Sequence, residues 1–312
     1  MSGFKVLQPG LLTLIQDGGR FGHHRIGLTN GGPLDRPAFH WANRLVGNEI
    51  NATALEVSIG GLVLEAETDT VIALTGAEMA LKINGQEQER WCTQVVKAGD
   101  RVEVTFSTAG ARGYLAVAGG FQIDHSFDSA ATVTREGLGG LSGEKLAQGD
   151  HLACKTTSNA PRYRLPEQFR PDYSADVTLR VICGYQQDAF SDVQKRLFFT
   201  SEYQVTDRAD RMGYRLEGPQ ITPSIDGILS EGICHGAIQV PADGQPIVLL
   251  NDRQTIGGYP KIGSMISLDT GRMAQLLSGA KVSFEEITME DAHNLHSLNR
   301  KRFERIELET LS

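Results

Sequence analysis

Polar side chains are concentrated in residues 236–263, which read GAIQVPADGQPIVLLNDRQTIGGYPKIG. Within this stretch, residues 246–250 form a short apolar run rich in branched side chains, which predicts a buried strand. Polar residues follow without a break at 251–255, and a Gly-Gly pair then turns the chain. Polar groups held at the mouth of a buried strand are typical of functional sites. The alternative is that these side chains satisfy backbone groups in a long turn.

A second polar cluster, residues 207–215, reads DRADRMGYR and contains both arginines and aspartates. Because arginine forks grip carboxylates and phosphates, this cluster is a candidate anion-binding loop. The alternative is a solvated loop whose charges pair with one another at little energetic gain.

The elements expected around these clusters are mostly strands joined by tight turns. Short apolar runs predict strands at residues 71–74, 80–83, 102–106 and 177–181. Asp35 as a cap and Pro37 in the first turn predict a helix that Gly47 ends. Apolar spacing predicts further helices around residues 190–198, 272–277 and 289–306. Residues 4–16 are expected to form one strand that enters a turn.

Composition and charge narrow the class of protein. A chain of 312 residues suffices for two domains, and the weakly periodic stretch 156–176 predicts domains at 1–160 and 161–312. The net charge of −8 and the lack of a basic stripe argue against a nucleic-acid partner. No apolar run approaches the ~20 residues of a membrane helix, and the first residues lack a signal-peptide core. We therefore expect a cytoplasmic protein without a membrane partner.

Cofactor motifs are weak in this sequence. The scattered cysteines at 92, 154, 183 and 234 predict reduced, mostly buried thiols. His293 and His296 lie three apart without an evident third ligand, so we expect no metal site. The glycine-rich residues 138–145 lack the Gly-Lys-Ser/Thr ending of a phosphate loop. The chain also shows no Met-Lys motif for biotin attachment.

Three blocks carry a family resemblance that spans nearly the whole chain. They are LIQDGGRFG with GGPLD, then DRADRMGYRLEGP, then residues 236–263. Together they resemble the allophanate hydrolase subunit 2 family of biotin-dependent carboxyltransferase-like proteins, whose stand-alone members include 5-oxoprolinase C subunits and KipA regulators. The resemblance implies two cyclophilin-like β-barrel domains. The expected fold is therefore mainly β with a few short helices.

The resemblance also implies a subunit of an ATP-dependent 5-oxoprolinase, an amidohydrolase that opens the cyclic amide 5-oxoproline to glutamate. It implies a hetero-oligomer with an allophanate hydrolase subunit 1-like protein and a LamB/YcsF-like subunit. ATP would be bound through the complex, and the isolated chain would be inactive. Two alternatives stay open: a KipA-type regulatory binding protein without catalysis, and a carboxyltransferase component related to urea carboxylase.

This chemistry gives roles to the polar residues of the matching blocks. Asp17 and Asp252 are candidate general acids or bases, and Tyr259 and Lys261 would stabilise developing negative charge. The candidates for substrate binding, which would hold anions or orient amide groups, are Gln16, Arg20, Arg208, Arg211, Gln239, Arg253, Gln254 and Thr255.

The chain departs from the family pattern after residues 118–121. Family members usually carry a Gly-Ser-Arg-Ser-Thr-like segment there, whereas this chain reads FDSAATVT at residues 127–134. The arginine is missing. If that arginine helps to bind substrate in the family, the substrate of this chain could differ.

An internal similarity links the two ends of the chain. LIQD at residues 14–17 resembles LLND at residues 249–252, and glycines follow in both cases. The similarity raises the possibility of two related halves.

Overall fold

The computed structural model describes residues 2–157, 161–173 and 176–311. Contacts divide the chain into unit 1, which comprises Met1–Gly22, Asn30–Tyr173 and Glu307–Ser312, and unit 2, which comprises His23–Thr29 and Ser174–Ile306. The domain limits expected from the sequence, 1–160 and 161–312, stay a prediction; the contacts place residues 161–173 with unit 1.

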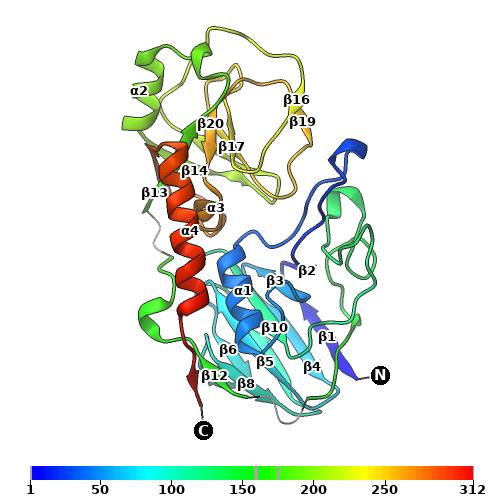
Figure 1. Ribbon diagram of the computed structural model, residues 1–312. Helices are drawn as coiled ribbons and strands as arrows, with labels where there is room; N and C mark the ends of the chain where they lie inside the picture. The colour runs from blue at the N-terminus through cyan, green and yellow to red at the C-terminus, as the bar shows by residue number, and fades with distance from the viewer. Residues whose placement is uncertain (1, 158–160, 174–175, 312) are drawn as a thin grey trace. The chain divides into compact units, whose positions relative to one another are not determined.

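Unit 1 is built mainly from strands (Figure 1). Its described elements are β1 (Gly3–Pro9), β2 (Leu12–Gln16), α1 (Arg36–Leu45), β3 (Ala54–Ser58), β4 (Leu62–Ala66), β5 (Thr70–Gly76), β6 (Leu81–Ile83), β7 (Gln86–Gln88), β8 (Thr93–Val96), β9 (Arg101–Val104), β10 (Arg112–Val117), η2 (Thr134–Glu136), β11 (His151–Ala153), β12 (Tyr163–Arg164), η3 (Glu167–Phe169) and β22 (Glu309–Thr310).

Two sheets of unit 1 share a hydrophobic core. The six-stranded sheet has the order β11-β1-β4-β9-β6-β7, and the five-stranded sheet has the order β2-β3-β10-β5-β8. Phe4 of the first sheet and Leu55 and Leu115 of the second belong to one buried cluster. Burial of each such side chain contributes about 1.5–3 kcal/mol, so this core is the main source of stability in unit 1.

Helix α1 covers the outer face of the five-stranded sheet, where β5 and β10 are buried along their whole length (Figure 1). The helix begins after Asp35, whose carboxylate accepts a hydrogen bond from the Ala38 amide at 3.1 Å. Pro37 lies in the first turn, where its missing N–H costs nothing. The Asp35 carboxylate also accepts a hydrogen bond from the Tyr173 hydroxyl at 3.0 Å. The expected cap and helix are thus confirmed.

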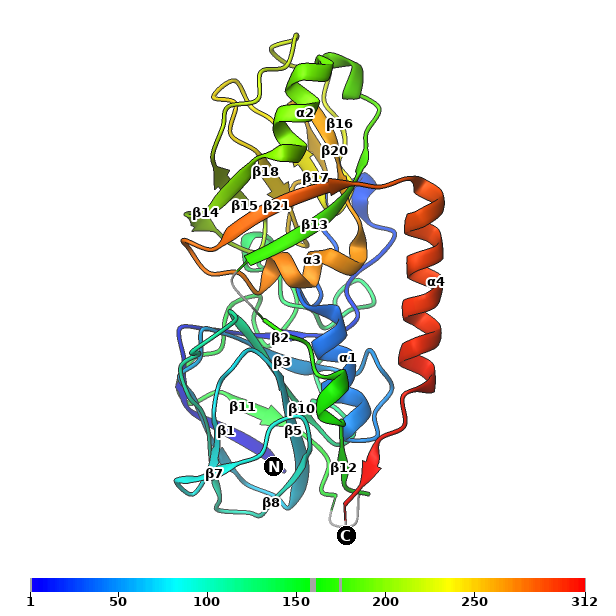
Figure 2. The ribbon, with the colours of Figure 1, turned by 90° about the vertical axis from the view of Figure 1, so that its left-hand side faces the viewer.

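Unit 2 combines a barrel with three α-helices in its described residues (Figure 2). Its elements are η1 (His24–Ile26), β13 (Asp176–Cys183), η4 (Gln187–Ala189), α2 (Asp192–Thr200), β14 (Glu202–Ala209), β15 (Gly213–Glu217), β16 (Glu231–Gly232), β17 (Ala237–Gln239), β18 (Ile247–Leu249), β19 (Ile256–Gly257), β20 (Lys261–Met265), α3 (Ser267–Ala274), β21 (Lys281–Glu286) and α4 (Met289–Arg305).

Seven strands of unit 2 close into a barrel in the order β13-β20-β17-β18-β15-β14-β21. A parallel pairing of β13 with β21 completes the ring. In β13, Val177, Leu179 and Val181 are buried while the residues between them are exposed or half-buried. This alternation is expected when one face of a strand lines the core, and closure leaves no unpaired edge.

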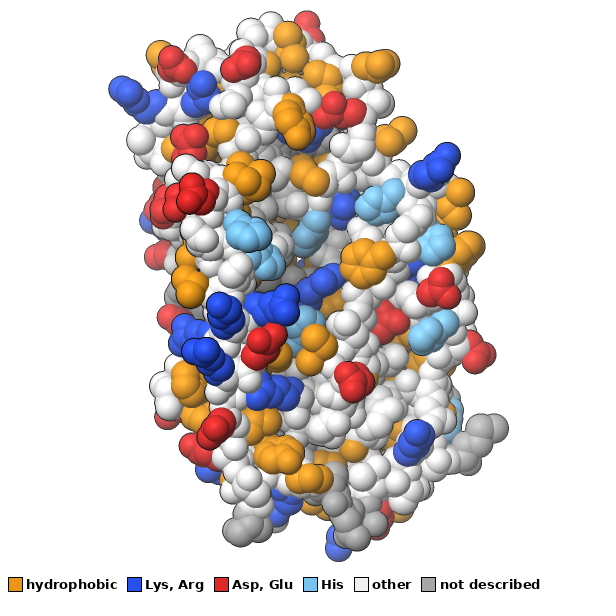
Figure 3. Space-filling view, in the orientation of Figure 1, with side chains coloured by type: hydrophobic (Ala, Val, Ile, Leu, Met, Phe, Trp, Pro, Cys, Tyr) orange, Lys and Arg blue, Asp and Glu red, His pale blue; other side chains and the backbone are white. Residues whose placement is uncertain are grey.

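The helices of unit 2 are held by an aromatic stack and a buried carboxylate. Phe198 of α2 stacks on Phe284 of β21, with ring centroids 4.6 Å apart. The buried Asp269 of α3 accepts hydrogen bonds from the Arg180 backbone amide and guanidinium at 2.6–2.9 Å. Acidic side chains occupy the first turn of α4 and basic ones its last turn, which suits the helix dipole and can be followed in Figure 3. No helix in the described residues is long and apolar enough to cross a membrane.

The expected mainly β fold with a few short helices is confirmed, and unit 2 contains a closed barrel, as the resemblance implied. Two expected elements need correction. Residues 4–16 form two strands, because Gly10 turns the chain with φ +72°. The helix expected at 272–277 spans Ser267–Ala274 instead. Its first half buries Asp269, whose polarity hid the helix from an apolar pattern.

Removal of the α1 cap should destabilise unit 1. Both tryptophans, Trp41 and Trp91, are buried in this unit, so tryptophan fluorescence during urea unfolding reports on it. We expect Asp35→Ala to lower the free energy of unfolding by about 2 kcal/mol or more, because the helix cap and the partner of Tyr173 are both lost. Asp35→Asn, which keeps an acceptor, should lose less. An unchanged transition for Asp35→Ala would contradict the assigned role.

Candidate functional site

Unit 2 contains a pocket of about 400 Å³ beside the strands of its barrel. Four of the predicted site residues, Arg208, Gln239, Gln254 and Tyr259, line it. The other lining residues are Asp207, Ala209, Asp210, Met212, Gly213, Arg215, Ile233, Ile247 and Leu249. The pocket is therefore built from β14, β15, β17, β18 and the segment that connects β18 to β20.

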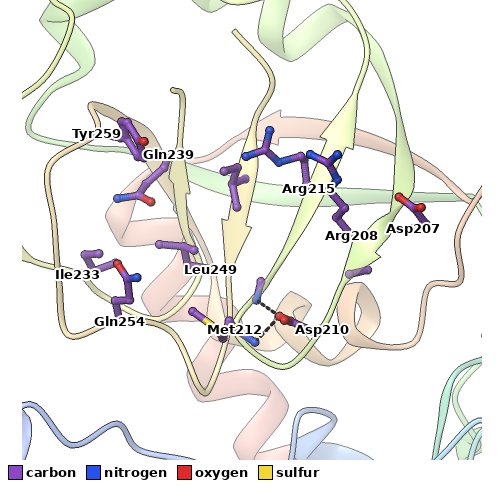
Figure 4. A pocket seen from close by; sticks show the side chains of 13 residues that line it. Asp207, Arg208, Asp210, Met212, Arg215, Ile233, Gln239, Leu249, Gln254 and Tyr259 are labelled. Carbon is purple, nitrogen blue, oxygen red and sulfur yellow. Dashed lines mark hydrogen bonds between the residues drawn. The ribbon is translucent and has the colours of Figure 1, made fainter. Parts of the chain in front are cut away.

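The cationic side of this pocket is formed by Arg208 and Arg215, which lie on β14 and β15 (Figure 4). Arg215 donates from Nη1 to Asp243 at 2.9 Å, but both side chains are partly exposed, so this pair contributes at most about 1 kcal/mol. Within the described part of the chain, no ion pair includes Arg208. Both guanidinium groups keep N–H donors that can bind an anion.

The opposite side of the pocket carries Gln239 and Tyr259 (Figure 4). Gln239 is only 6% exposed, and its amide makes no hydrogen bond with the described residues. Gly257 leaves room for the Gln239 side chain, because a Cβ atom on residue 257 would lie 2.8 Å from Nε2 of Gln239, which is too close. Tyr259 is exposed and follows the same glycine turn. The Gln239 amide lines the pocket and is therefore free to meet a ligand group or water there.

A buried ion pair holds the hairpin between β14 and β15. The Arg211 guanidinium donates from Nε to Oδ2 of Asp252 at 2.8 Å and from Nη2 to Oδ1 at 3.0 Å. The Asp252 amide donates back to the Arg211 carbonyl at 2.9 Å. Neither side chain is among the pocket-lining groups. The predicted roles of Asp252 in catalysis and of Arg211 in binding stay predictions. The geometry shows that the pair joins the β14–β15 turn to the end of β18.

The remaining predicted residues of unit 2 also have partners within the protein. Arg253 is buried and donates to the carbonyls of Ile233 at 3.0 Å and Leu250 at 3.2 Å, and burial lowers its guanidinium pKa. The Thr255 carbonyl accepts a hydrogen bond from the Ile233 amide at 3.0 Å. Arg253 and Thr255 therefore fix Ile233 in the pocket wall.

Lys261 forms an ion pair at the edge of the small β16–β19 sheet. Its Nζ lies 2.7 Å from the Glu231 carboxylate, which also accepts a hydrogen bond from Gln186 at 2.8 Å. Hydrogen bonds from Lys261 and then Gln186 hold the pKa of Glu231 below its usual value. The predicted role of Lys261 in charge stabilisation stays a prediction.

Asp17 of the N-terminal block lies in unit 1 and accepts hydrogen bonds on both carboxylate oxygens. Oδ1 accepts from the Gly19 amide at 2.9 Å and from the Ser129 hydroxyl at 2.6 Å, and Oδ2 accepts from the Ala130 amide at 2.7 Å. In this structure Asp17 fastens residues 129–130 to the end of β2.

Gln16 and Arg20 fasten the same segment from either side of Asp17. Gln16 donates from Nε2 to the Thr132 carbonyl at 3.0 Å. Arg20 is buried and donates to the carbonyls of Ser126 at 3.0 Å and Ala131 at 3.1 Å. Between these contacts, the non-glycine residues at 127 and 128 have φ of +54° and +63°, an unfavourable backbone that the surrounding structure must hold.

The residues singled out from the sequence did not include Glu231, and Arg215 was covered only as part of the charged stretch 207–215. Arg215 alternates with the buried Tyr214 on β15, so its place in the pocket follows from strand periodicity once the strand is known. Glu231 lies thirty positions from its partner Lys261 and carried no local signal.

All four cysteines are free, as expected, and two of them are buried. Cys92 and Cys154 are buried and free, and burial raises the pKa of Cys154 to about 11. Cys183 is half-buried, and burial with the neighbouring Glu286 raises its thiol pKa to about 12. Cys234 is exposed.

The fold and the pocket define a mainly β barrel protein, and the chain belongs to a known family. The family model described as "Carboxyltransferase domain, subdomain A and B" matches residues 26–286. The chain is 36% identical to the C subunit of 5-oxoprolinase from Escherichia coli (strain K12) over 303 residues, which cover 97% of each chain. It is 29% identical to urea amidolyase of Lachancea kluyveri over 99% of this chain, but it spans only 18% of that enzyme.

Solved structures agree with this assignment. The K. lactis urea amidolyase aligns with 98% of this chain at a TM-score of 0.92 and 28% identity, and the chain covers 20% of it. TTHA0988 aligns with 91% of this chain at a TM-score of 0.82 and 33% identity, and the chain covers 56% of it. The resemblance to carboxyltransferase-like proteins that the sequence blocks indicated is therefore confirmed.

Disruption of the Arg211–Asp252 pair should destabilise unit 2. We expect Asp252→Ala to lower the free energy of unfolding by about 3–5 kcal/mol, because it leaves a buried guanidinium without its counter-charge. Arg211→Met combined with Asp252→Ala should cost clearly less than the sum of the single changes. Urea unfolding followed by far-UV circular dichroism gives these values. Additive losses would contradict a coupled pair.

Asp17 should control local opening of residues 126–132. Asp17→Ala removes several hydrogen bonds worth about 1–3 kcal/mol each, so amide exchange in this segment should accelerate by about tenfold or more. Hydrogen–deuterium exchange with mass spectrometry measures this change. Asp150→Ala is the matched control, because among the described residues the Asp150 side chain accepts only from the nearby Ala147 amide. Equal exchange at 126–132 in both variants would contradict the fastening.

Proposed function

We propose that this chain is one component of an ATP-dependent 5-oxoprolinase that opens 5-oxoproline to glutamate together with partner subunits. The observation that carries the proposal is the 36% identity with the C subunit of the Escherichia coli 5-oxoprolinase over 97% of both chains. The corresponding C subunit from Haemophilus influenzae is 34% identical over 91% of both chains. A similarity that covers a whole relative supports a shared role more strongly than one confined to a fifth of a larger enzyme.

The reaction divides naturally between this chain and its partners. Ring opening adds water across the amide C–N bond, with oxygen going to the carbonyl carbon and a proton to the nitrogen. A lactam is a stable amide, and ATP bound by the complex would supply its activation. Because this chain lacks a phosphate loop, we assign ATP binding to the assembly. The isolated chain is then inactive, and its contribution is to hold and orient the substrate.

The partners follow from the family resemblance. We propose an allophanate hydrolase subunit 1-like protein and a LamB/YcsF-like protein as the companions. Of the four candidate catalytic residues, Tyr259 lines the pocket, whereas Asp17, Asp252 and Lys261 already bind other protein groups. We therefore assign Tyr259 to the substrate, Asp252 to the positioning of the β14–β15 hairpin that carries pocket residues, and Asp17 to the positioning of residues 129–130 within unit 1.

The second candidate function is that of a carboxyltransferase component. The TM-score of 0.92 with the K. lactis urea amidolyase and the family description favour it. In this function the carboxyl group would arrive on a biotin carried by another protein, because this chain has no biotin attachment motif.

Reconstitution distinguishes these functions. Glutamate release from 5-oxoproline and ATP is measured for the chain alone, for each pairwise mixture, and for the chain with both proposed partners. We expect glutamate only from the complete mixture. Carboxyl transfer from carboxybiotin to urea without glutamate release would favour the second candidate. Neither activity from a complex whose assembly is verified by light scattering would contradict both, and would leave the KipA-type regulatory function.

A further inference from the structure

Three side chains form a row across adjacent strands of the unit 2 pocket. Arg215 of β15 pairs in register with Ile247 of β18, and Ile247 pairs in register with Gln239 of β17. All three line the pocket. Neighbouring strands lie about 4.8 Å apart, so the row places a guanidinium and an amide on either side of an apolar residue. Such a row matches a small ligand with one anionic end, an apolar middle and one amide edge.

The amide end of the row favours a cyclic amide over an open-chain one. A carboxamide such as that of Gln239 presents its C=O and one N–H side by side. The amide of a small ring is held cis, so its C=O and N–H also lie side by side, and the two groups can exchange two hydrogen bonds. An open-chain secondary amide is trans and presents these groups on opposite sides. Gln239 lines the pocket and its amide makes no hydrogen bond with the described residues, so it is available for this pairing.

The anionic end of the row is served by two guanidinium groups. Arg208 lies beside Arg215 on the same side of the pocket (Figure 4). Arg215 already binds Asp243 through Nη1, but its other N–H donors are not used by that contact. One carboxylate, which accepts forked hydrogen bonds, fits this end.

We propose that the unit 2 pocket binds a small cyclic amide that carries one carboxylate. The carboxylate lies against Arg208 and Arg215, the ring packs on Ile247, and the amide edge pairs with Gln239. The inference deepens the proposed function and rests on it only for the choice of 5-oxoproline as the test ligand. Because every lining residue belongs to unit 2, the chain alone holds the complete pocket.

Isothermal titration calorimetry of the chain alone with a set of related probes tests the pocket. The probes are 5-oxoproline, 2-pyrrolidone, which lacks the carboxylate, and N-acetylalanine, which has a carboxylate but a trans amide. We expect 5-oxoproline to bind. Each of the other two probes should bind more weakly by at least about tenfold, because each loses a set of hydrogen bonds. No binding of 5-oxoproline, or equal binding of all three probes, would overturn the proposal.

Variants of the row identify the groups responsible. Arg215→Gln and Arg208→Gln change exposed or half-buried residues, and each should weaken 5-oxoproline binding by about tenfold while leaving 2-pyrrolidone unaffected. Gln239→Leu should weaken both lactams and leave N-acetylalanine unaffected. Arg196→Gln, on the exposed face of α2, is the matched control for loss of one positive charge and should change nothing. Unchanged 5-oxoproline binding in the arginine variants and in Gln239→Leu would overturn the proposal.

The pocket and the proposed function fail in different ways. If the chain binds 5-oxoproline through this row but the complete assembly releases no glutamate, the pocket stands and the proposed function fails. If the assembly releases glutamate with the same KM for 5-oxoproline in the Arg215→Gln and Gln239→Leu variants, the function stands and the pocket is overturned.

Discussion

The buried ion pair between Arg211 and Asp252 is the interaction on which the pocket of unit 2 depends. Removal of both charges from water costs several kcal/mol per ion, of order 5 kcal/mol, and only good geometry compensates for it. Here two parallel N–H donors meet two carboxylate oxygens, and a backbone hydrogen bond joins the same residues. The pair ties the β14–β15 hairpin to the end of β18. Arg208 and Arg215 stand on either side of that hairpin turn, so their positions follow from a contact that lies outside the pocket lining.

Unit 1 also contains a carboxylate at a strand end that accepts hydrogen bonds from a distant segment, but its donors are different. Asp17 follows the strand β2 as Asp252 follows β18, and each carboxylate accepts hydrogen bonds from a segment distant in the sequence. The donors to Asp17 are a hydroxyl and backbone amides, whereas the donor to Asp252 is a guanidinium. The similarity between LIQD and LLND therefore has a physical meaning: in both, the aspartate at a strand end binds a segment distant in the sequence through hydrogen bonds. Such residues act on function through the segments that they hold.

The sequence predicted the fold well where local signals are strong. The cap Asp35 is encoded by neighbouring residues, and it is confirmed. Helix α3 was misplaced because its start depends on Asp269, whose partner Arg180 lies 89 positions away. No local pattern carries a contact of that range.

The site was predictable in residue type but not in role. Arg208 and Arg211 lie three positions apart in one charged stretch, yet one lines the pocket and the other is buried in an ion pair. The pairing of β14 with β15 shifts register between Val205 and Ala209, so the alternation of a regular strand does not fix where Arg208 points. Which polar groups face a ligand and which hold the frame is decided by such irregularities. They depend on packing between strands and leave no signature in residue type.

The departure from the family pattern at residues 127–134 bears on unit 1 alone. Ser129 and Ala130 bind Asp17, and the carbonyls of Ser126 and Ala131 accept hydrogen bonds from Arg20. The guanidinium of Arg20 therefore lies along the backbone of this segment. None of these residues lines the unit 2 pocket, where the cations come from β14 and β15. In the proposed binding mode, the groups that meet a carboxylate and an amide belong to unit 2, and the altered segment is not among them.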